Sequence, residues 1–252
     1  MLLMIKNNPL RQHMAGSAGF SLVEMGVVLT IVALLMAGLL PSLSSQLDLK
    51  QINETRTQME EIRSSLIGFA VANGRLPCPD TDTPPDGVEN FAAPATTNDM
   101  PQTGKSTKIT ACSSQSGGLP YNQLGTPKLD TYNGAYVYRI TSVFGEKDEI
   151  YSGLNATGTL LTTTYFKLSN NGNLRICMTA ACSSPRLFDN AVAVIVSRGK
   201  NWALTPSADE TANTDNNNDF VSRDFSSDFD DLVVWISPNT LFNRMVSAGK
   251  LP

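Results

Sequence analysis

Apolar residues follow two different patterns along the first third of the chain. From residue 20 to residue 40 they are nearly continuous, and only Ser21, Glu24 and Thr30 are clearly polar. At roughly 1.5 Å per residue, such a helix would be about 31 Å long, which is enough to cross the hydrocarbon core of a bilayer. Residues 20–40 are therefore predicted to form a transmembrane helix.

After residue 41 the apolar positions recur every three, four or seven residues, which predicts an amphipathic helix. Pro41 lacks a backbone N–H and is predicted to interrupt the helix between its two parts. Gly74 and Pro77 are predicted to end it. The apolar face contains Ile52, Met59, Ile62, Leu66 and Ala70. The charged remainder contains Lys50, Glu54, Arg56, Glu60 and Arg63, with Arg56 and Glu60 at i, i+4.

From residue 132 onward the pattern favours β-strands that are rich in Val, Ile, Thr, Tyr and Phe. Residues 170–173 are a hairpin signal, so antiparallel pairing is expected, with the helix covering one side of the sheet. The last two strands are almost wholly apolar and are predicted to be central, and a capped helix follows from Ser237 to Gly249. The predicted strands are 135–143, 160–168, 173–178, 191–197 and 232–236.

Residues 76–118 separate the helix from the strands and are rich in Thr, Pro, Asp, Asn, Gly and Ser. A segment with so few apolar residues cannot bury much core, so a long irregular loop is predicted. The fold class expected from the whole pattern is α+β.

Glu24 is the anomaly in the first apolar run. An acidic side chain at the middle of a bilayer costs about 2.5–3.5 kcal/mol, so its presence suggests a function. Residues 20–40 contain no Lys or Arg to neutralise it. Cleavage between Gly19 and Phe20 would create an α-amino group four residues before Glu24, which another copy of the chain could present. An ordinary secretory signal has a shorter apolar run, and a plain membrane anchor would not explain the glutamate.

The hexapeptide Gly19-Phe-Ser-Leu-Val-Glu24 and the apolar run after it resemble the class III signal of type IV prepilins and type II secretion pseudopilins. The resemblance is specific over residues 16–55 and general beyond them. It implies that prepilin peptidase cuts after Gly19 and methylates Phe20, and that Glu24 pairs with the terminal amine of a neighbouring subunit. Pro41 falls where many type IV pilins carry a helix-loosening proline.

A pilin-like fold follows from the same resemblance, with a long N-terminal helix packed on an antiparallel sheet and a long disulfide-bounded loop. The implied organisation is a leader at residues 1–19, a transmembrane and assembly helix at 20–40, the amphipathic half of the helix at 41–74, and a globular domain at 75–252. Lys6 and Arg11 precede the apolar run, which places that end in the cytoplasm. The expected product is a single-pass inner-membrane protein with a periplasmic C-terminal domain, incorporated into a fibre at the cell surface.

Four cysteines in a translocated chain predict two disulfides, with three possible connectivities. Cys177 and Cys182 are close enough in sequence to pin a short turn, and pairing them leaves Cys78 with Cys112. A zinc site is the alternative, but the chain has no C-x-x-C repeat, and its single histidine, His13, lies in the leader.

Catalytic chemistry has little support in the sequence. Without a histidine after the leader, Ser-His-Asp and Cys-His arrangements are excluded, and no phosphate-binding glycine loop is present. The chain has 19 Lys+Arg against 23 Asp+Glu, for a formal net charge of −4. Nucleic acid is therefore an improbable general partner. Residues 197–201 are interpreted as a solvated turn, and Trp202 and Trp235 as core residues.

The acidic segment from residue 209 to residue 231 is the best candidate for a metal site. Its 215–219 stretch offers oxygens at alternate positions, as Ca²⁺ requires, although Phe220 and Ser226 stand where an EF-hand has Gly and Glu. Some pseudopilins carry Ca²⁺ in a comparable late loop, and a hydrated loop without metal is the alternative. The candidate ligands are Asp215, Asn217, Asp219 and Asp224, and a weaker second cluster contains Asp80, Asp82, Asp86 and Glu89.

The expected function is that of a minor structural subunit of a type IV pilus or a related fibre, not an enzyme. The implied partners are prepilin peptidase, the assembly platform, and other pilin or pseudopilin subunits through the N-terminal helix. The alternatives are a minor pseudopilin of type II secretion, a pilus-tip adhesin or DNA-uptake module, and a membrane-anchored periplasmic enzyme.

Overall fold

The computed structural model describes residue 19 and residues 21–92, 107–150 and 168–251 of the chain. The chain divides into two compact units, residues 1–48 and residues 49–252, which are described separately. The elements are helices α1 (Leu22–Asn73), α2 (Tyr121–Leu124), α3 (Ala208–Ala212) and α4 (Pro238–Ser247), the 3₁₀ turn η1 (Ser142–Phe144), and strands β1 (Thr107–Thr110), β2 (Ser116–Gly118), β3 (Val137–Ile140), β4 (Lys147–Ile150), β5 (Leu174–Cys177), β6 (Phe188–Ala191), β7 (Ala193–Ser197), β8 (Asp219–Val221) and β9 (Leu232–Ile236).

Helix α1 is continuous, so the prediction that Pro41 interrupts it is wrong. A proline inside a helix removes one backbone hydrogen bond, and the turns on either side can still hold the helical path. The prediction that residues 20–40 span a bilayer finds no support within the described residues, because no helix there is long and apolar enough to cross a membrane.

The second half of α1 has the predicted apolar face. Met59, Ile62, Leu66 and Ala70 are fully buried, and Ile52 is half-buried. The helix ends as expected at Gly74, whose φ of 75° suits a residue without a Cβ and whose N–H donates to the Ala70 carbonyl at 2.8 Å. On the charged side, the described ion pair of Glu60 is with Arg63, three residues away.

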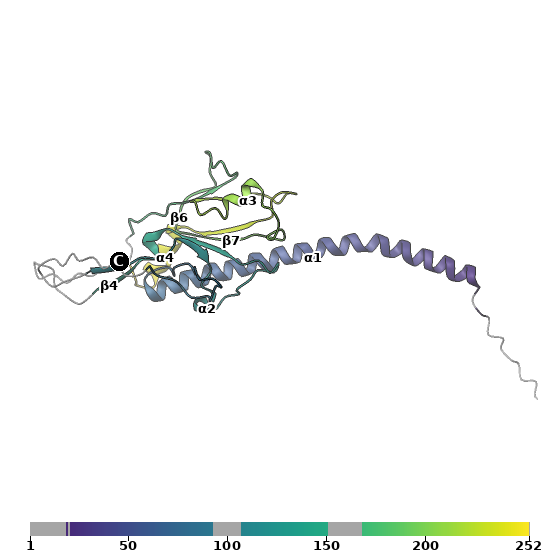
Figure 1. The fold of residues 1–252 in the computed structure, drawn as a ribbon, viewed down its shortest axis with the longest axis horizontal. Helices are drawn as coiled ribbons and strands as arrows, with labels where there is room; N and C mark the ends of the chain where they lie inside the picture. The colour runs from purple at the N-terminus through teal and green to yellow at the C-terminus, as the bar shows by residue number, and fades with distance from the viewer. Residues whose placement is uncertain (1–18, 20, 93–106, 151–167, 252) are drawn as a thin grey trace, which may run out of the picture. The chain divides into compact units, whose positions relative to one another are not determined.

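The main sheet has four antiparallel strands in the order β2-β3-β7-β9. Its strand β7 is labelled in Figure 1. Strand β7 is central, as predicted, and all five of its residues are buried. Strand β9 has the predicted bounds but lies at the edge of the sheet, so the expectation of a central strand is wrong. It is apolar for another reason, because side chains on both of its faces contribute to a core.

Two cores lie on opposite sides of the main sheet. One contains Ile62, Leu66, Ile195 and Ile236, and it joins α1 and α4 to the sheet. The other contains Val194 and Val196 and joins the main sheet to a smaller sheet with the order β6-β5-β8. Helix, main sheet and small sheet therefore form successive layers. The pairing of β5 with β8 is parallel, which the sequence pattern did not predict.

The remaining predicted elements agree in part with the structure. The predicted strand at residues 160–168 lies almost entirely outside the described residues, and β1 and β4, which pair with each other, were not predicted. The C-terminal helix α4 begins as expected, because the Ser237 hydroxyl accepts from the Thr240 N–H at 3.2 Å. The architecture is thus α+β, with an antiparallel main sheet and two disulfides.

Candidate functional site

The beginning of α1 is the first candidate site. The helix begins at Leu22, directly after Ser21, whose hydroxyl accepts from the Glu24 N–H at 3.1 Å. Glu24 lies in the first turn and is exposed, as is Gly19, whereas Phe20 is not among the described residues. An acid in the first turn of a helix interacts favourably with the helix dipole.

Large apolar side chains cover this part of α1 and are exposed in the isolated chain. Leu22 is 91% exposed and Leu34 is 70% exposed. The others in the same stretch are Val23, Met25, Val27, Val28, Leu29, Ile31, Val32, Leu35 and Met36. An exposed apolar surface of this extent indicates that lipid or protein covers it in the cell.

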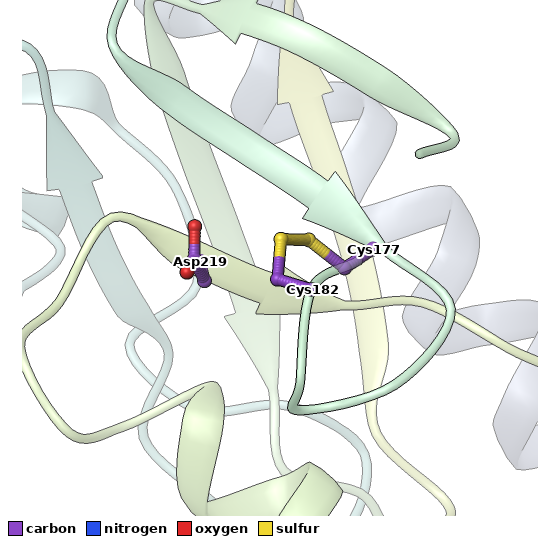
Figure 2. A group of neighbouring side chains, drawn as sticks. All are labelled: Cys177, Cys182 and Asp219. Atoms are coloured by element: carbon purple, nitrogen blue, oxygen red, sulfur yellow. A yellow bond between two sulfur atoms is a disulfide. The ribbon is translucent and has the colours of Figure 1, made fainter. Parts of the chain in front are cut away.

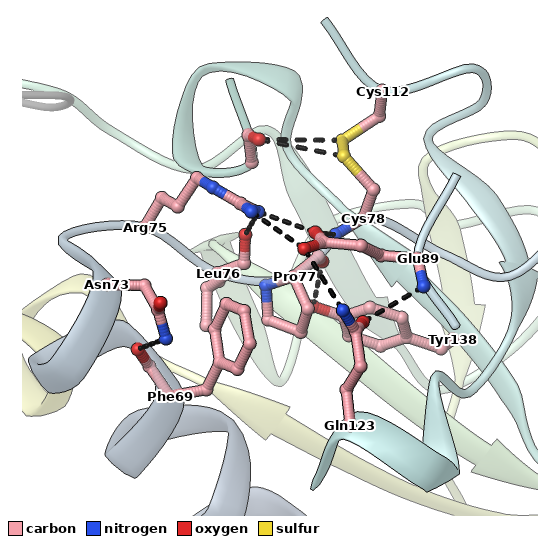
Figure 3. Close-up of polar contacts among 11 residues, drawn as sticks. Phe69, Asn73, Arg75, Leu76, Pro77, Cys78, Glu89, Cys112, Gln123 and Tyr138 are labelled. Atoms are coloured by element: carbon pink, nitrogen blue, oxygen red, sulfur yellow. Dashed lines mark hydrogen bonds and ion pairs between the residues drawn. A yellow bond between two sulfur atoms is a disulfide. The ribbon is translucent and has the colours of Figure 1, made fainter. Parts of the chain in front are cut away.

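A buried ion pair holds the loop that follows α1 (Figure 3). The Arg75 guanidinium donates to both carboxylate oxygens of Glu89, at 2.6 and 2.7 Å, and each side chain is less than a tenth exposed. The same guanidinium lies over the rings of Phe69 and Phe91, 5.5 and 4.8 Å from their centroids. Glu89 also accepts from the Cys78 N–H. Because the charged groups of Arg75 and Glu89 find their partners within the protein, this cluster is interpreted as structural.

Both disulfides have the connectivity expected from the sequence. Cys78–Cys112 closes the irregular loop, with the two sulfurs 3.6 and 3.7 Å from the Gly145 carbonyl oxygen (Figure 3). Cys177–Cys182 lies beside Asp219 (Figure 2). Sulfurs joined in a disulfide are not thiolate ligands, and Asp219 accepts from Arg175 at 2.5 and 2.7 Å. This group is therefore a poor metal site.

The candidate calcium residues bond mainly within their own loop and to arginine. The carboxylate of Asp215 accepts from the backbone N–H and the side-chain amide of Asn217, and the Asn217 side-chain oxygen accepts from the Asp219 N–H at 2.6 Å. Asp219 is paired with Arg175, and Asp224 is exposed after β8. Most of the candidate ligand oxygens of this loop therefore already accept hydrogen bonds from the protein itself.

In the second predicted acidic cluster, the carboxylates of Asp80 and Glu89 likewise have partners within the protein. The carboxylate of Asp80 accepts from the N–H groups of Asp82 and Gly87, at 3.0 and 2.7 Å, and so organises the turn between them. Oxygens of Asp80, Asp82 and Asp86 lie within 4.8 Å of one another, whereas Glu89 belongs to the ion pair with Arg75.

A third group of acids lies where β9 begins; its members belong to the acidic segment singled out from the sequence but are not among the candidate ligands. Glu210, Asp230 and Asp231 bring carboxylate oxygens within 4.8 Å of one another. Glu210 is held by the capping box of α3, in which its side chain accepts from the Ser207 N–H at 2.8 Å. Asp231 accepts from the Asn213 side-chain amide at 2.7 Å. No local motif could have revealed this group, because Glu210 lies about twenty positions before the two aspartates and meets them only through the fold.

Burial makes two members of this group, Asp230 and Asp231, hold their protons more tightly than exposed aspartates do. It raises the pKa of Asp231 from 3.8 to about 7, against the hydrogen bond from Asn213, and the neighbouring charges of Glu210 and Asp230 act in the same direction as burial. Burial also raises the pKa of Asp230, although the N–H groups of Lys200 and Asn201 donate to its carboxylate. The 197–201 segment is therefore a turn fixed on Asp230, not merely a solvated one.

Beside these acids is a small cavity of about 70 Å³, lined partly by Arg198, Trp202, Glu210 and Asp231. Trp202 is 37% exposed and donates from its indole N–H to the Tyr132 carbonyl at 2.9 Å, so the prediction that it is a core residue is wrong. Arg198 lies over its ring at 5.6 Å from the centroid, so an arginine of the chain itself already covers that ring. Trp235 is half-buried against Phe188.

No family model, curated protein or solved structure matches the chain.

Proposed function

We propose that the chain is a structural subunit of a pilus-like fibre, assembled through the first half of α1 after cleavage between Gly19 and Phe20. The observation that carries this proposal is that the two halves of α1 differ in the burial of their apolar side chains. The part around Ile62 and Leu66 is buried against the sheet, whereas the part from residue 22 to residue 36 exposes apolar side chains throughout. A helix with two such halves suits a subunit that holds its globular part by one half and its neighbours by the other.

The exposed half would be unfavourable in water at about 25 cal/mol for each square ångström of apolar surface. We propose that the lipid of the inner membrane covers it before assembly and that the helices of neighbouring subunits cover it afterwards. Transfer from lipid to a helix bundle gains little from hydrophobicity, because lipid is equally apolar. Packing and polar contacts between helices must then supply the cohesion.

Glu24 is proposed to set the register between subunits. It lies in the first exposed turn of α1, close in sequence to the amine that cleavage would create on Phe20. A carboxylate surrounded by apolar helices is strongly destabilised without a cation. The Phe20 amine of an adjacent subunit would neutralise it in only one axial position. Prepilin peptidase and the assembly platform are the partners that this pathway requires.

The experiment that tests this proposal combines processing with assembly. N-terminal sequencing of the mature chain should read a methylated Phe20. Glu24→Ala should leave membrane insertion and cleavage unchanged and abolish incorporation into fibres. Glu54→Ala is the matched control, because Glu54 is an exposed acid of α1 whose described ion pair is the surface pair with Lys50. A mature chain that begins elsewhere than Phe20, or normal incorporation of Glu24→Ala, would contradict the proposal.

Among pilus-like fibres, we propose a minor subunit of a type IV pilus. The loop closed by Cys78 and Cys112 adds an excursion that repeated subunits in a uniform fibre do not need. Pro41 within α1 favours the pilus over the secretion pseudopilus by resemblance. Counting this chain against the total subunits of purified fibres by quantitative mass spectrometry would decide between a minor and a major role.

A further inference from the structure

We propose that the groove along the open edge of β9 binds an extended peptide segment of another protein chain, one that carries a carboxylate. This groove, called the β9 groove, is bounded by β9 on one side and by Arg56, Glu60 and Arg63 of α1 on the other. The inference holds whether or not the proposed fibre function does, because it depends only on residues of the globular unit.

The two edges of the main sheet differ. The β2 edge is closed, since Asp80 and Gly118 exchange backbone hydrogen bonds of 3.0 and 2.7 Å across it. Strand β9 pairs with β7, and within the described part of the chain no strand lies on its other side. An unpaired strand edge presents N–H and C=O groups that another strand can bond.

Two hollows follow this open edge, with volumes of about 390 and 340 Å³. They share Glu60, Val233 and Val234, so they form one continuous groove. It extends from Asp231 to Ser237, a length that at roughly 3.3 Å per residue matches an extended peptide of about seven residues. A groove between a helix and an open strand edge is the geometry in which peptides add a strand to a sheet.

The apolar lining specifies part of the occupant. Val233, Val234 and Trp235 are half-buried, Phe225 at one end is 39% exposed, and Phe188 lies at the other. A strand added here would place alternate side chains against these residues. Apolar residues at every second position of the peptide are therefore expected.

The helix wall presents two arginines, Arg56 and Arg63, and one acid, Glu60, to the groove. Arg63 donates to Glu60 at 3.0 Å, and its buried Nε has no hydrogen-bond partner among the described atoms. Arg56 lies over the Phe225 ring at 5.7 Å, and it forms no ion pair within the described residues. A buried donor without a partner costs free energy, and a carboxylate on the peptide would satisfy it. The neighbouring Arg223 is already paired with Asp209 and Asp228.

The test uses the full-length chain in neutral detergent and a defined probe. The probe is a capped heptapeptide in which valine alternates with threonine and the central threonine is replaced by aspartate. A second peptide carries lysine at that position. Binding is followed by NMR amide shifts and by amide hydrogen exchange of β9, because exchange reports backbone hydrogen bonds and not merely proximity.

The aspartate peptide should shift the amides of Leu232–Ile236 and slow the exchange of alternate ones at least tenfold. The lysine peptide should bind at least tenfold more weakly. Combined substitution of Arg56→Gln and Arg63→Gln should remove that difference, whereas Lys128→Gln, which changes a cation over Tyr121, should preserve it.

Four results would overturn the proposal. They are no response of β9 to about 1 mM aspartate peptide, shifts without slowed exchange, equal binding of the two peptides, and protection of the β9 edge before peptide is added. The last result would mean that a second copy, or a segment of the same chain, already occupies the groove. Dependence of that protection on protein concentration would distinguish the two.

Discussion

Replacing Asp231 with asparagine should change how the stability of the globular unit depends on pH. Asp231 is 4% exposed, and its carboxylate lies within reach of Glu210 and Asp230. Asparagine has nearly the same shape and retains an oxygen that can accept from the Asn213 amide, now at 2.7 Å. The substitution therefore removes the titratable carboxyl group and changes the packing around it very little.

The size of the change in stability follows from the pKa values of Asp231 in the folded and unfolded states. The folded chain holds the Asp231 proton with a pKa of about 7, and the unfolded chain with a pKa of 3.8. Because the folded state binds this proton more tightly, the contribution to stability is complete below about pH 4 and is lost as the pH rises through 7. At 1.36 kcal/mol per pH unit, this carboxyl lowers the free energy of unfolding by about 4 kcal/mol between these limits.

The assay is urea unfolding of the full-length chain in neutral detergent from pH 4 to pH 8, followed by tryptophan fluorescence. The wild-type chain should lose stability as the pH rises, and Asp231→Asn should lose much less and be the more stable of the two at pH 8. Asp224→Asn is the matched control, because it removes one exposed carboxylate from the same segment. Equal slopes for wild type and Asp231→Asn would refute the reasoning that burial keeps this carboxyl protonated.

The remaining predictions concern the stability of the globular unit and can be measured from the same unfolding curves. Glu89→Gln leaves the Arg75 charge buried without its counter-ion and should cost about 3–5 kcal/mol, whereas replacing both partners with apolar residues should cost less. Loss of the Cys78–Cys112 disulfide should cost about 4 kcal/mol, and loss of Cys177–Cys182 about 2 kcal/mol, because the first closes a loop of 34 residues and the second a loop of 5. Ile62→Ala removes a fully buried side chain and should cost about 2–5 kcal/mol, and a smaller loss would mean that the α1 face is not packed on the sheet.

Local patterns predicted the elements whose signals are local. The spacing of Met59, Ile62 and Leu66 predicted the buried face of α1, and Ser237 predicted the start of α4. Each of these signals needs only one turn of helix or one capping side chain to take effect. The cysteine spacing worked for a related reason, because pairing the two close cysteines left one pairing for the others.

Properties set by distant parts of the chain could not be predicted in this way. The residues of β9 are as apolar as those of a central strand because both of its faces are covered, and hydropathy does not reveal whether an edge is paired. The group of Glu210, Asp230 and Asp231 forms only when the start of β9 meets α3. The helical path through Pro41 depends on the turns around it, which a proline rule does not include.

The edge position of β9 also bears on how the globular unit would behave in an assembly. In the proposed fibre, a subunit held by its N-terminal helix would still present an open strand edge, and open edges tend to pair without specificity. The arginines on the α1 wall limit this tendency, since an approaching strand without a carboxylate would desolvate the exposed part of the Arg63 side chain without giving it a new partner. Selectivity at β9 would then come from the same helix that holds the globular unit, with Arg63 projecting one turn beyond Met59 of the buried face.

Arg63→Met should accordingly broaden the range of peptides that the β9 groove accepts without lowering the stability of the unit. Binding of the valine–threonine heptapeptide without a charged residue, measured by the shifts of the β9 amides, should become at least tenfold tighter in this variant, and unchanged binding would show that the arginine plays no part in the selection.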